Sequence, residues 1–488
     1  MTATLERPTT AATPPRTDTV SGPLVGRRRW IAFTVILAAT VMDILDSTIV
    51  NVAAPSVQRD LGTSSAQLEW VAAAYTLAIA VGLLPSGRLG DRLGRKRMLL
   101  LGLAGFLGAS VLCACAWSPG SLIAARVLQG LAAAVLTPQT FGLIRDIFGP
   151  AEVGKAFAAF GPTIGLSTVA GPVVAGLLID WDPAGTDWRS LFLINVPLGV
   201  FALAVGARVL PSGHTSRTVG IDVPGSLLMA VIAFVLVFPL VDGRTLGWPA
   251  WVFAVLAAAV PLLAVFVVRQ RRRERLGRAT LVETSVLRKR SYVSGIVFVL
   301  VFFGALTGFT LTVGLYLQVA VGMTALHASL YLMAMSIGTM LGAGVGSWAA
   351  TAVGRPILHV GLAVMAVGAA VLLVELHHAG AVPGFWTLTP GLFVFGLGMG
   401  QIFVPLFSII TGEIDDHEIG TASGLLEALQ QLGASLGVAV LATLFFAHLG
   451  QGASRAAIEI PLWAALGLIA VAFPIAGLLP RRARADAH

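Results

Sequence analysis

The sequence predicts an all-α, polytopic membrane protein in which fourteen transmembrane helices form two six-helix bundles and a central two-helix insertion. Composition is the first reason. Apolar residues make up 56% of the 488 positions and charged residues 11%, whereas soluble chains carry about 25% charged residues. The mean hydropathy of +0.87 points the same way. The other two reasons are the length of the apolar runs and the placement of basic residues between them.

The apolar runs are long enough to cross a bilayer. A helix needs about 20 residues to span the hydrocarbon core, and fourteen segments reach or approach that length. They lie near 30–54, 68–86, 98–117, 121–142, 156–179, 190–210, 222–241, 249–268, 292–317, 327–350, 356–376, 387–411, 420–447 and 459–479.

A weak internal repeat divides these segments into two sets. Gly354 lies seven residues after Ser347, as Gly94 lies seven after Gly87. Two related bundles about a pseudo-two-fold axis are a transporter architecture. We therefore expect a disordered cytoplasmic tail (1–29), a six-helix bundle (30–210), a helix hairpin (222–268), a basic cytoplasmic loop (269–291), a second six-helix bundle (292–479) and a cytoplasmic tail (480–488).

The basic residues predict the orientation of the chain. With the N-terminus inside, the internal loops and flanks hold 25 Lys and Arg, and the external loops hold four. The positive-inside rule therefore places both termini in the cytoplasm and requires an even number of spans. Because the basic residues lie at the ends of apolar runs, the net charge of +8 fits anionic lipid headgroups rather than nucleic acid.

One short basic segment separates the second and third runs. Residues 87–97 carry five basic side chains and one carboxylate, as a cytoplasmic loop should. Their order resembles the signature loop between helices 2 and 3 of the major facilitator superfamily. The resemblance implies a conformational latch between the two bundles, formed by Gly87, Asp91, Arg92, Gly94 and Arg95.

Four further segments resemble the 14-helix drug:proton antiporter branch of that superfamily. They resemble, in order, that branch's first-helix motif, its entry to helix 6, its helix 9 ending and its helix 13. The segments are Leu45–Pro55, Trp188–Pro197, Leu315–Gln318 and Gly420–Gly433. Together they are distributed along most of the chain, from residue 30 to about 445.

Two acids lie deep in the first predicted span. At a rise of about 1.5 Å per residue, Asp43 and Asp46 are well inside the membrane and on one helix face. A carboxylate there is costly, so it is a candidate to take a proton or to face a cation. Asp46 matches the family motif, and Asp43 is not required by it. A hydrogen bond that only holds a neighbouring helix is the alternative for each.

Arg126 is the one Lys or Arg well inside a predicted span, away from its ends, and it needs a partner there. With Gln129 and Gly130 it matches the fourth-helix pattern of the family. The resemblance implies a role in proton transfer near the first-helix acids. A permanent ion pair between helices is the alternative.

Glu427 departs from the family pattern, which often has Asn at this position. It either adds a second titrating or cation-facing site or lies at the wet cytoplasmic mouth. A permissive substrate cavity should also be lined by aromatic and flexible side chains. The candidate substrate-binding residues are therefore Glu427, Tyr75, Gln129, Tyr316, Met399 and Phe403.

Glycine and proline recur in the fifth span, 156–179. Small residues let helices approach closely in lipid, and proline bends a helix axis. The pattern resembles the antiporter motif of the family, although Ala175 and Gly176 replace its glycine pair. Helix packing alone is the alternative. The residues concerned are Gly161, Pro162, Gly171, Pro172 and Gly176.

A second glycine series lies within the span 387–411. Gly396, Gly398 and Gly400 alternate with apolar residues. Because the series lies inside a predicted span, we expect a helix packing face rather than a nucleotide-binding turn.

These observations predict a proton-coupled secondary transporter that exports drugs or other organic compounds by alternating access, as a monomer in the plasma membrane. Its partners would be the organic substrate, protons and membrane lipids, with no cofactor, metal site or nucleic acid. A dedicated exporter of one self-made metabolite or antibiotic is the alternative within transport. An enzyme is not expected, because the sequence has no cluster of nucleophile, base and oxyanion donors.

Overall fold

The computed structural model describes residues 26–148, 153–182, 185–211, 220, 222–243, 245–278, 280–281, 285–378, 384–410, 414, 419–449 and 454–481. Over these ranges every regular element is a helix, so the predicted all-α class is confirmed. The helices are α1 (Arg27–Leu61), α2 (Ser65–Leu93), α3 (Arg95–Ala114), α4 (Pro119–Phe148), α5 (Val153–Trp181), α6 (Arg189–Leu193), α7 (Asn195–Val209), α8 (Val223–Asp242), α9 (Ala250–Arg275), α10 (Arg290–Leu315), α11 (Ala325–Val353), α12 (Pro356–His378), α13 (Phe385–Ile410), α14 (Ile419–Leu449) and α15 (Ser454–Ala476).

The helices have the length and composition of membrane spans. In the described part of the chain, 13 segments are long and apolar enough to cross a bilayer, with α6 and α7 together forming one of them. The fourteenth expected span is α5, a 29-residue helix whose described apolar stretch, Ala170–Trp181, is shorter. The chain is therefore a multi-pass membrane protein.

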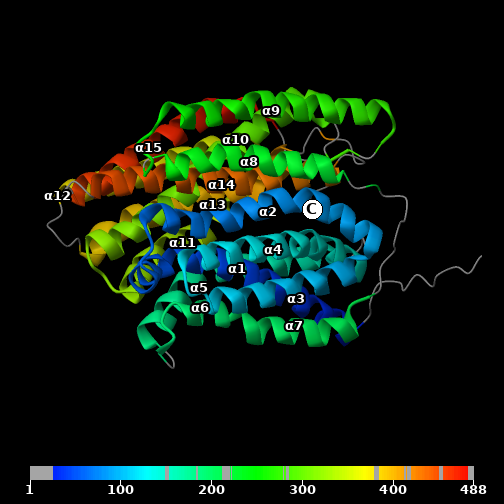
Figure 1. Cartoon of the computed structure of the whole chain (residues 1–488), viewed down its shortest axis with the longest axis horizontal. Coiled ribbons are helices and arrows are strands. Elements are labelled where there is room, and N and C mark those ends of the chain that lie inside the picture. Colours follow the sequence, from blue (N-terminus) through cyan, green and yellow to red (C-terminus); the bar gives the residue numbers. More distant parts are fainter. Residues whose placement is uncertain are drawn as a thin grey trace, which may run out of the picture.

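All long helices run side by side along one axis (Figure 1). We call the face where α1 begins and α15 ends the terminal face, and the opposite face the distal face. Contacts at the terminal face join segments far apart in sequence: Lys96 donates to the Leu210 carbonyl at 2.9 Å, and Arg355 donates to the Gly477 carbonyl at 2.6 Å. Helices α1 to α7 pack with one another, as do α10 to α15.

Three predicted boundaries differ from the structure. The loop expected at residues 87–97 is reduced to one non-helical residue, Gly94, whose φ of 95° and N–H bond to the Gly90 carbonyl separate α2 from α3. Glycine adopts this φ without steric cost, so the chain turns in a single residue. The basic loop expected from residue 269 begins later, because α9 continues to Arg275. The sixth span is broken at Ile194 between α6 and α7.

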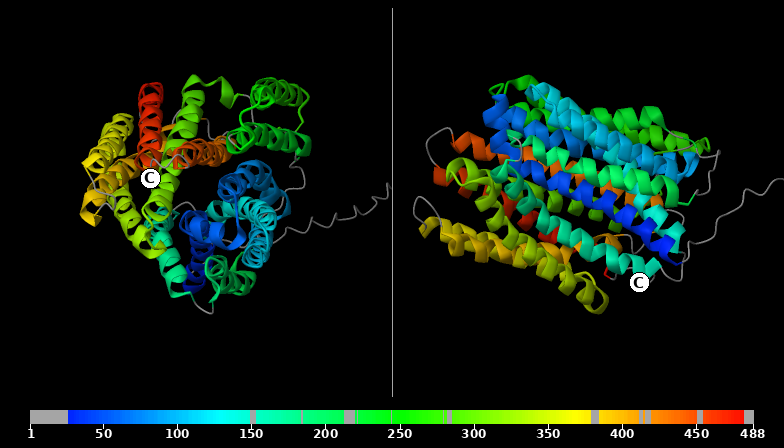
Figure 2. Two further views of the ribbon diagram at one scale, coloured as in Figure 1. Left: turned by 60° about the vertical axis from the view of Figure 1, so that its left-hand side comes forward. Right: turned by 90° about the horizontal axis from the view of Figure 1, so that it is seen from below.

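Helix α8 of the central hairpin lies along the seam between the two bundles (Figure 2). It packs against α2 of one bundle and α14 of the other through small and branched apolar side chains. At the distal end, the Trp70 indole donates to Asp242 at 2.7 Å, and Thr443 donates to the Leu240 carbonyl at 3.1 Å. The buried residues of this cluster are Ala66, Ala73 and Ala80 of α2, Ala233, Val237 and Val241 of α8, and Leu432 and Ala439 of α14.

The glycine series of the twelfth predicted span is a packing face, as expected. A Cβ atom on Gly396 would overlap the backbone of Met335, and one on Gly400 would overlap the Thr339 carbonyl, both on α11. A Cβ atom on Gly398 would instead overlap the Gly361 carbonyl on α12. Close backbone approach through small residues is the usual mode of helix packing in lipid.

Candidate functional site

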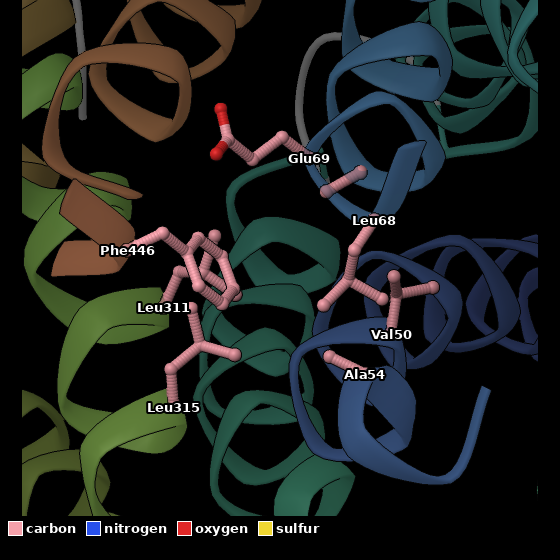
Figure 3. Close-up of a pocket in the computed structure, with 8 residues that line it drawn as sticks. Val50, Ala54, Leu68, Glu69, Leu311, Leu315 and Phe446 are labelled. Atoms are coloured by element: carbon pink, nitrogen blue, oxygen red, sulfur yellow. The ribbon is translucent and has the colours of Figure 1, made fainter. Parts of the chain in front are cut away.

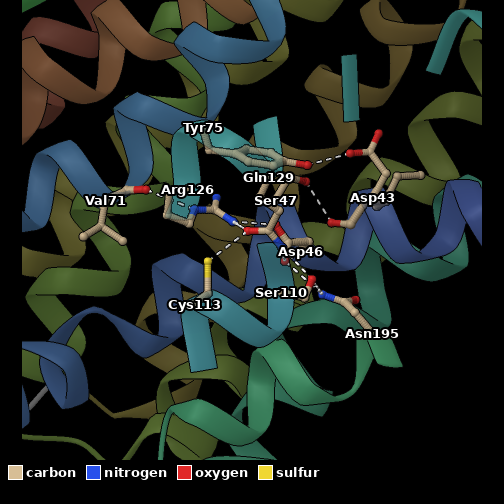
Figure 4. Close-up of polar contacts among 11 residues, drawn as sticks. Asp43, Asp46, Ser47, Val71, Tyr75, Ser110, Cys113, Arg126, Gln129 and Asn195 are labelled. Atoms are coloured by element: carbon tan, nitrogen blue, oxygen red, sulfur yellow. Dashed lines mark hydrogen bonds and ion pairs between the residues drawn. The ribbon is translucent and has the colours of Figure 1, made fainter. Parts of the chain in front are cut away.

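The centre of the first bundle is a buried ion pair. Asp46 of α1 is fully buried, and its Oδ2 lies 2.5 Å from Nη1 of Arg126 on α4. Its Oδ1 accepts hydrogen bonds from Gln129 Nε2 at 2.7 Å and from Asn195 Nδ2 at 3.0 Å. Figure 4 shows these four side chains converging from α1, α4 and α7. Among the described residues every hydrogen-bond partner of the carboxylate is a donor, which is the arrangement that an ionised carboxylate requires.

Arg126 is held on several sides. Its Nε donates to the Val71 carbonyl at 3.2 Å, and its Nη1 donates to Gln129 Oε1 at 2.8 Å as well as to Asp46. The guanidinium carbon lies 3.9 Å from the centre of the Tyr75 ring, a cation–π contact. The guanidinium therefore keeps favourable contacts even when the charge of Asp46 changes.

A second layer of polar side chains orients the two amides. Ser110 Oγ accepts from Gln129 Nε2 at 2.9 Å and from Asn195 Nδ2 at 3.3 Å. The thiol of Cys113 lies 3.5 Å from Gln129 Oε1. Ser110 and Asn195 were missing from the sequence-based candidates. Asn195 was within reach, because it lies in the Trp188–Pro197 motif, but Ser110 carried no sequence signal.

Asp43 has different neighbours. One oxygen accepts from the Tyr75 hydroxyl at 2.6 Å and the other from Thr137 at 3.4 Å. Glu427 of α14, half-buried, lies close enough for its charge to interact with that of Asp43. The structure thus brings together one carboxylate from each bundle, and among the described residues neither forms a salt bridge.

Three of the other candidate substrate residues lie in the second bundle, and two lie in the first. Tyr316 and Met399 are buried, and Phe403 is half-buried with its ring 5.7 Å from that of Phe303. Gln129, expected to face substrate, is instead fully buried against Asp46. Tyr75 is also buried, with its hydroxyl on Asp43 and its ring on Arg126.

A small recess lies between the bundles toward the distal face (Figure 3). One wall carries Glu69 of α2, a buried acid whose Oε2 accepts from Thr443 at 3.2 Å across the seam. Glu69 was missing from the sequence-based candidates, because it lies near the end of its predicted span, where a charge is unremarkable. The other residues lining the recess are Val50, Ala54, Leu68, Ala72, Leu311, Leu315 and Phe446.

The predicted latch residues lie where α2, α3 and α4 meet at the terminal face. Arg95 forms a salt bridge with Asp146 at 3.0 Å, within the first bundle. Arg92 is exposed, and Gly87 has open space around its Cα. The side chain of Asp91 lies outside the described part of the chain.

The glycine and proline residues of α5 are only partly described. Gly171 and Pro172 are buried, and a Cβ atom on Gly176 would lie 2.6 Å from Leu326 Cα on α11. This contact joins the two bundles near the distal face. The surroundings of Gly161 and Pro162 lie outside the described part of the chain.

Hydrogen bonds to the Asp60 carboxylate hold the start of α6 in place at the distal face. The Trp188 indole and the Arg189 guanidinium both donate to Asp60 at the end of α1, at 3.0 and 2.5 Å. These bonds lower the pKa of Asp60 below its ordinary value. They anchor the segment that carries Asn195 to the helix that carries Asp46.

The helices pack as two bundles, and the first holds a buried charge network, an arrangement typical of membrane transporters. The model of the Major Facilitator Superfamily matches residues 36–225 and 207–438, and the chain belongs to this family. It is a transporter rather than an enzyme.

Curated relatives share much of the chain. A Probable actinorhodin transporter of Streptomyces coelicolor is 45% identical over 91% of this chain and 78% of its own length. The Tetracenomycin C resistance and export protein of Streptomyces glaucescens is 31% identical over 87% of this chain and 77% of its own. Among solved structures, a peptide transporter POT in complex with sulfate matches with a TM-score of 0.67 and 18% identity, over 94% of this chain and 98% of that one. This last likeness concerns the fold alone.

Proposed function

We propose that this protein exports small organic compounds across the plasma membrane in exchange for protons, with the terminal face in the cytoplasm. The observation that carries the proposal is the fully buried carboxylate of Asp46, which is paired with Arg126 and bonded by two amides. An ionisable pair inside a membrane bundle is costly and is typical of a proton path. The placement of basic residues supports the orientation.

The geometry supports a coupling step at Asp46. When the carboxylate binds a proton, its attraction to Arg126 falls, and α1 is held to α4 less tightly. Arg126 retains the Val71 carbonyl, Gln129 and the Tyr75 ring, so it stays in place while α1 is released. Protonation would therefore bias the position of one helix, which is what coupling to a two-state movement requires.

The substrate would lie between the bundles, near Asp43 and Glu427, whose charges are close enough to interact. Two carboxylates there favour organic cations, because a charge in a low-dielectric cavity acts strongly on a bound ion. The tight contact of Gly176 with α11 and the Glu69–Thr443 bond hold the distal side together. The cavity would consequently open toward the terminal face in this arrangement.

Export of one self-made antibiotic is the second candidate. It is favoured by relatives whose names refer to single antibiotics, among them the Puromycin resistance protein pur8 of Streptomyces alboniger, 33% identical over 90% of this chain and 85% of its own. A drug-susceptibility panel on a deletion strain separates the two candidates. Sensitivity to many unrelated compounds supports broad export, and sensitivity to a single class supports a dedicated exporter.

Proton coupling is tested with Asp46→Asn, which keeps the shape of the side chain and removes its titration. In everted vesicles, substrate uptake driven by a pH gradient should fall to the level of vesicles without the protein, while the variant still inserts in the membrane. Ser110→Ala is the matched control, because it alters the same network without touching the carboxylate. Gradient-driven uptake at the wild-type rate in Asp46→Asn contradicts the proposal.

A further inference from the structure

We propose that Asn195 is a two-position switch that follows the protonation state of Asp46, with its side-chain amide donating to the carboxylate and turning to accept from the carboxylic acid. This inference rests on the proposed proton coupling, and it assigns a positioning role to a residue outside the Asp46–Arg126 pair. Asn195 is the first residue of α7, directly after the break at Ile194.

The first observation is an acceptor that lacks a donor. Asn195 is 1% exposed, and its Oδ1 has no hydrogen-bond partner among the described residues, whereas its Nδ2 donates to Asp46 at 3.0 Å and to Ser110 at 3.3 Å. A buried acceptor left without a donor is unfavourable and uncommon in native proteins. An orphaned atom beside a titrating group is the feature that requires an explanation.

The second observation is that the partners of the Asp46 carboxylate in the described part of the chain are all donors: Arg126, Gln129 and Asn195. They suit the ionised form. A proton added to Asp46 turns one oxygen into a donor, which then meets only N–H groups. The acid form needs an acceptor, and one of the two amides must supply it by rotating its N and O atoms.

Gln129 is poorly placed to rotate. Its Oε1 accepts from Arg126 Nη1 at 2.8 Å, so a turned Gln129 would direct its NH₂ group at the guanidinium. Asn195 loses no bond at Oδ1, because that atom has none to lose. Of the two amides, Asn195 therefore turns at the lower cost.

The step balances without any other reactant. One proton binds to Asp46 Oδ1, the Asn195 amide turns by about half a revolution, and its Oδ1 accepts the new O–H bond. The Ser110 hydroxyl, which accepts from Asn195 in the ionised state, is able to rotate and donate to the same Oδ1. Each state leaves one amide atom without a partner, so neither state is strongly favoured by Asn195, and the switch turns readily.

The test is an infrared difference spectrum of the full-length protein in lipid nanodiscs, recorded as the pH is stepped through the titration of Asp46. The C=O stretch of a carboxylic acid falls in frequency when its O–H donates a hydrogen bond. In the wild type we expect an Asp46 acid band that is hydrogen-bonded, together with a change in a side-chain amide band. In Asn195→Leu the amide change should vanish, and the acid band should move to higher frequency.

Asn195→Ala is the second variant, in case the larger leucine is not accommodated. Cys113→Ala is the matched control, because its thiol contacts Gln129 Oε1 and takes no part in the switch, so the acid band should stay in place. An acid band at the wild-type frequency in both Asn195 variants overturns the inference. Failure of the proposed function is a different result: the acid band would then be unaffected by Asp46→Asn, because another group titrates.

Discussion

The hydroxyl of Tyr75 donates to Asp43 at 2.6 Å. The ring of the same tyrosine covers the guanidinium that binds Asp46, at 3.9 Å from its centre. One side chain of α2 thus contacts both Asp43 and the Asp46–Arg126 ion pair of the first bundle. A change of charge at either acid alters the position that suits Tyr75, which gives a direct physical route between cation binding and protonation.

Glu427→Gln should weaken export of a monovalent cationic dye by roughly tenfold and leave export of a neutral drug nearly unchanged. The reason is that Glu427 contributes charge to the space that it shares with Asp43. Uptake of the two compounds into everted vesicles measures the difference. Equal loss for both compounds, or loss of the pH dependence of transport, would assign Glu427 to the proton path instead.

Gly90→Ala and Gly87→Ala form a matched pair in the latch segment. A Cβ atom on Gly90 would overlap the side-chain amide of Gln139, which donates to the Ser86 carbonyl at 3.0 Å, whereas a Cβ atom on Gly87 meets nothing within 4 Å. We expect Gly90→Ala to destabilise the protein by about 1–3 kcal/mol and to slow transport. Gly87→Ala should behave as the wild type in thermal unfolding in detergent, and equal destabilisation of both variants would refute the assignment.

Gly176→Ala should loosen the distal contact between the bundles. The new Cβ would lie 2.6 Å from the backbone of Leu326, so α5 and α11 must separate. We expect the equilibrium to shift toward a distally open state, seen as increased labelling of cysteines introduced into the recess near Val50. Gly108→Ala on α3, where a Cβ atom meets nothing within 4 Å, is the control. Unchanged labelling in Gly176→Ala would show that the contact does not limit opening.

Asp222 should stabilise the central hairpin. It is buried, caps α8 through the Gly225 N–H and accepts from Gln270 at 2.9 Å and from Arg269 at 2.7 Å. Burial by itself would raise the pKa of Asp222, but the bonds from Arg269, Gln270 and Gly225 outweigh it and leave the pKa below its ordinary value of 3.8.

Because the pKa of Asp222 is lowered in the folded state, its contribution is complete above about pH 4 and is lost as the pH falls through the folded value. Asp222→Ala should therefore cost about 2 kcal/mol at neutral pH. Thermal unfolding in detergent at pH 7 measures this loss. A wild-type melting temperature for Asp222→Ala would exclude the role.

The sequence predicted the membrane fold because the length of each apolar run and the charges at its ends are local properties that can be read without knowing how the helices pack. The pairing of Asp46 with Arg126 followed from one rule, that a charge in a span needs a partner. The roles of Asn195 and Ser110 did not follow from sequence, because they depend on how α3 and α7 lie around α1, which is a tertiary relationship. The sequence also predicted a loop over 87–97, where the structure has only Gly94 between two helices. Composition identifies a basic segment but does not reveal that one glycine at a φ of 95° makes the turn.

The position of α8 has a consequence for the lipid around the protein. Its bond to α2 runs from Trp70 to Asp242, whereas Thr443 of α14 has a single hydroxyl proton for two acceptors, Glu69 and the Leu240 carbonyl. If the bundles rock, α14 is free to exchange one acceptor for the other and slide along α8, which remains attached to α2. When the bundles separate, the gap between them would then face the surface of α8 rather than lipid acyl chains. The central hairpin would therefore keep lipid out of the transport path.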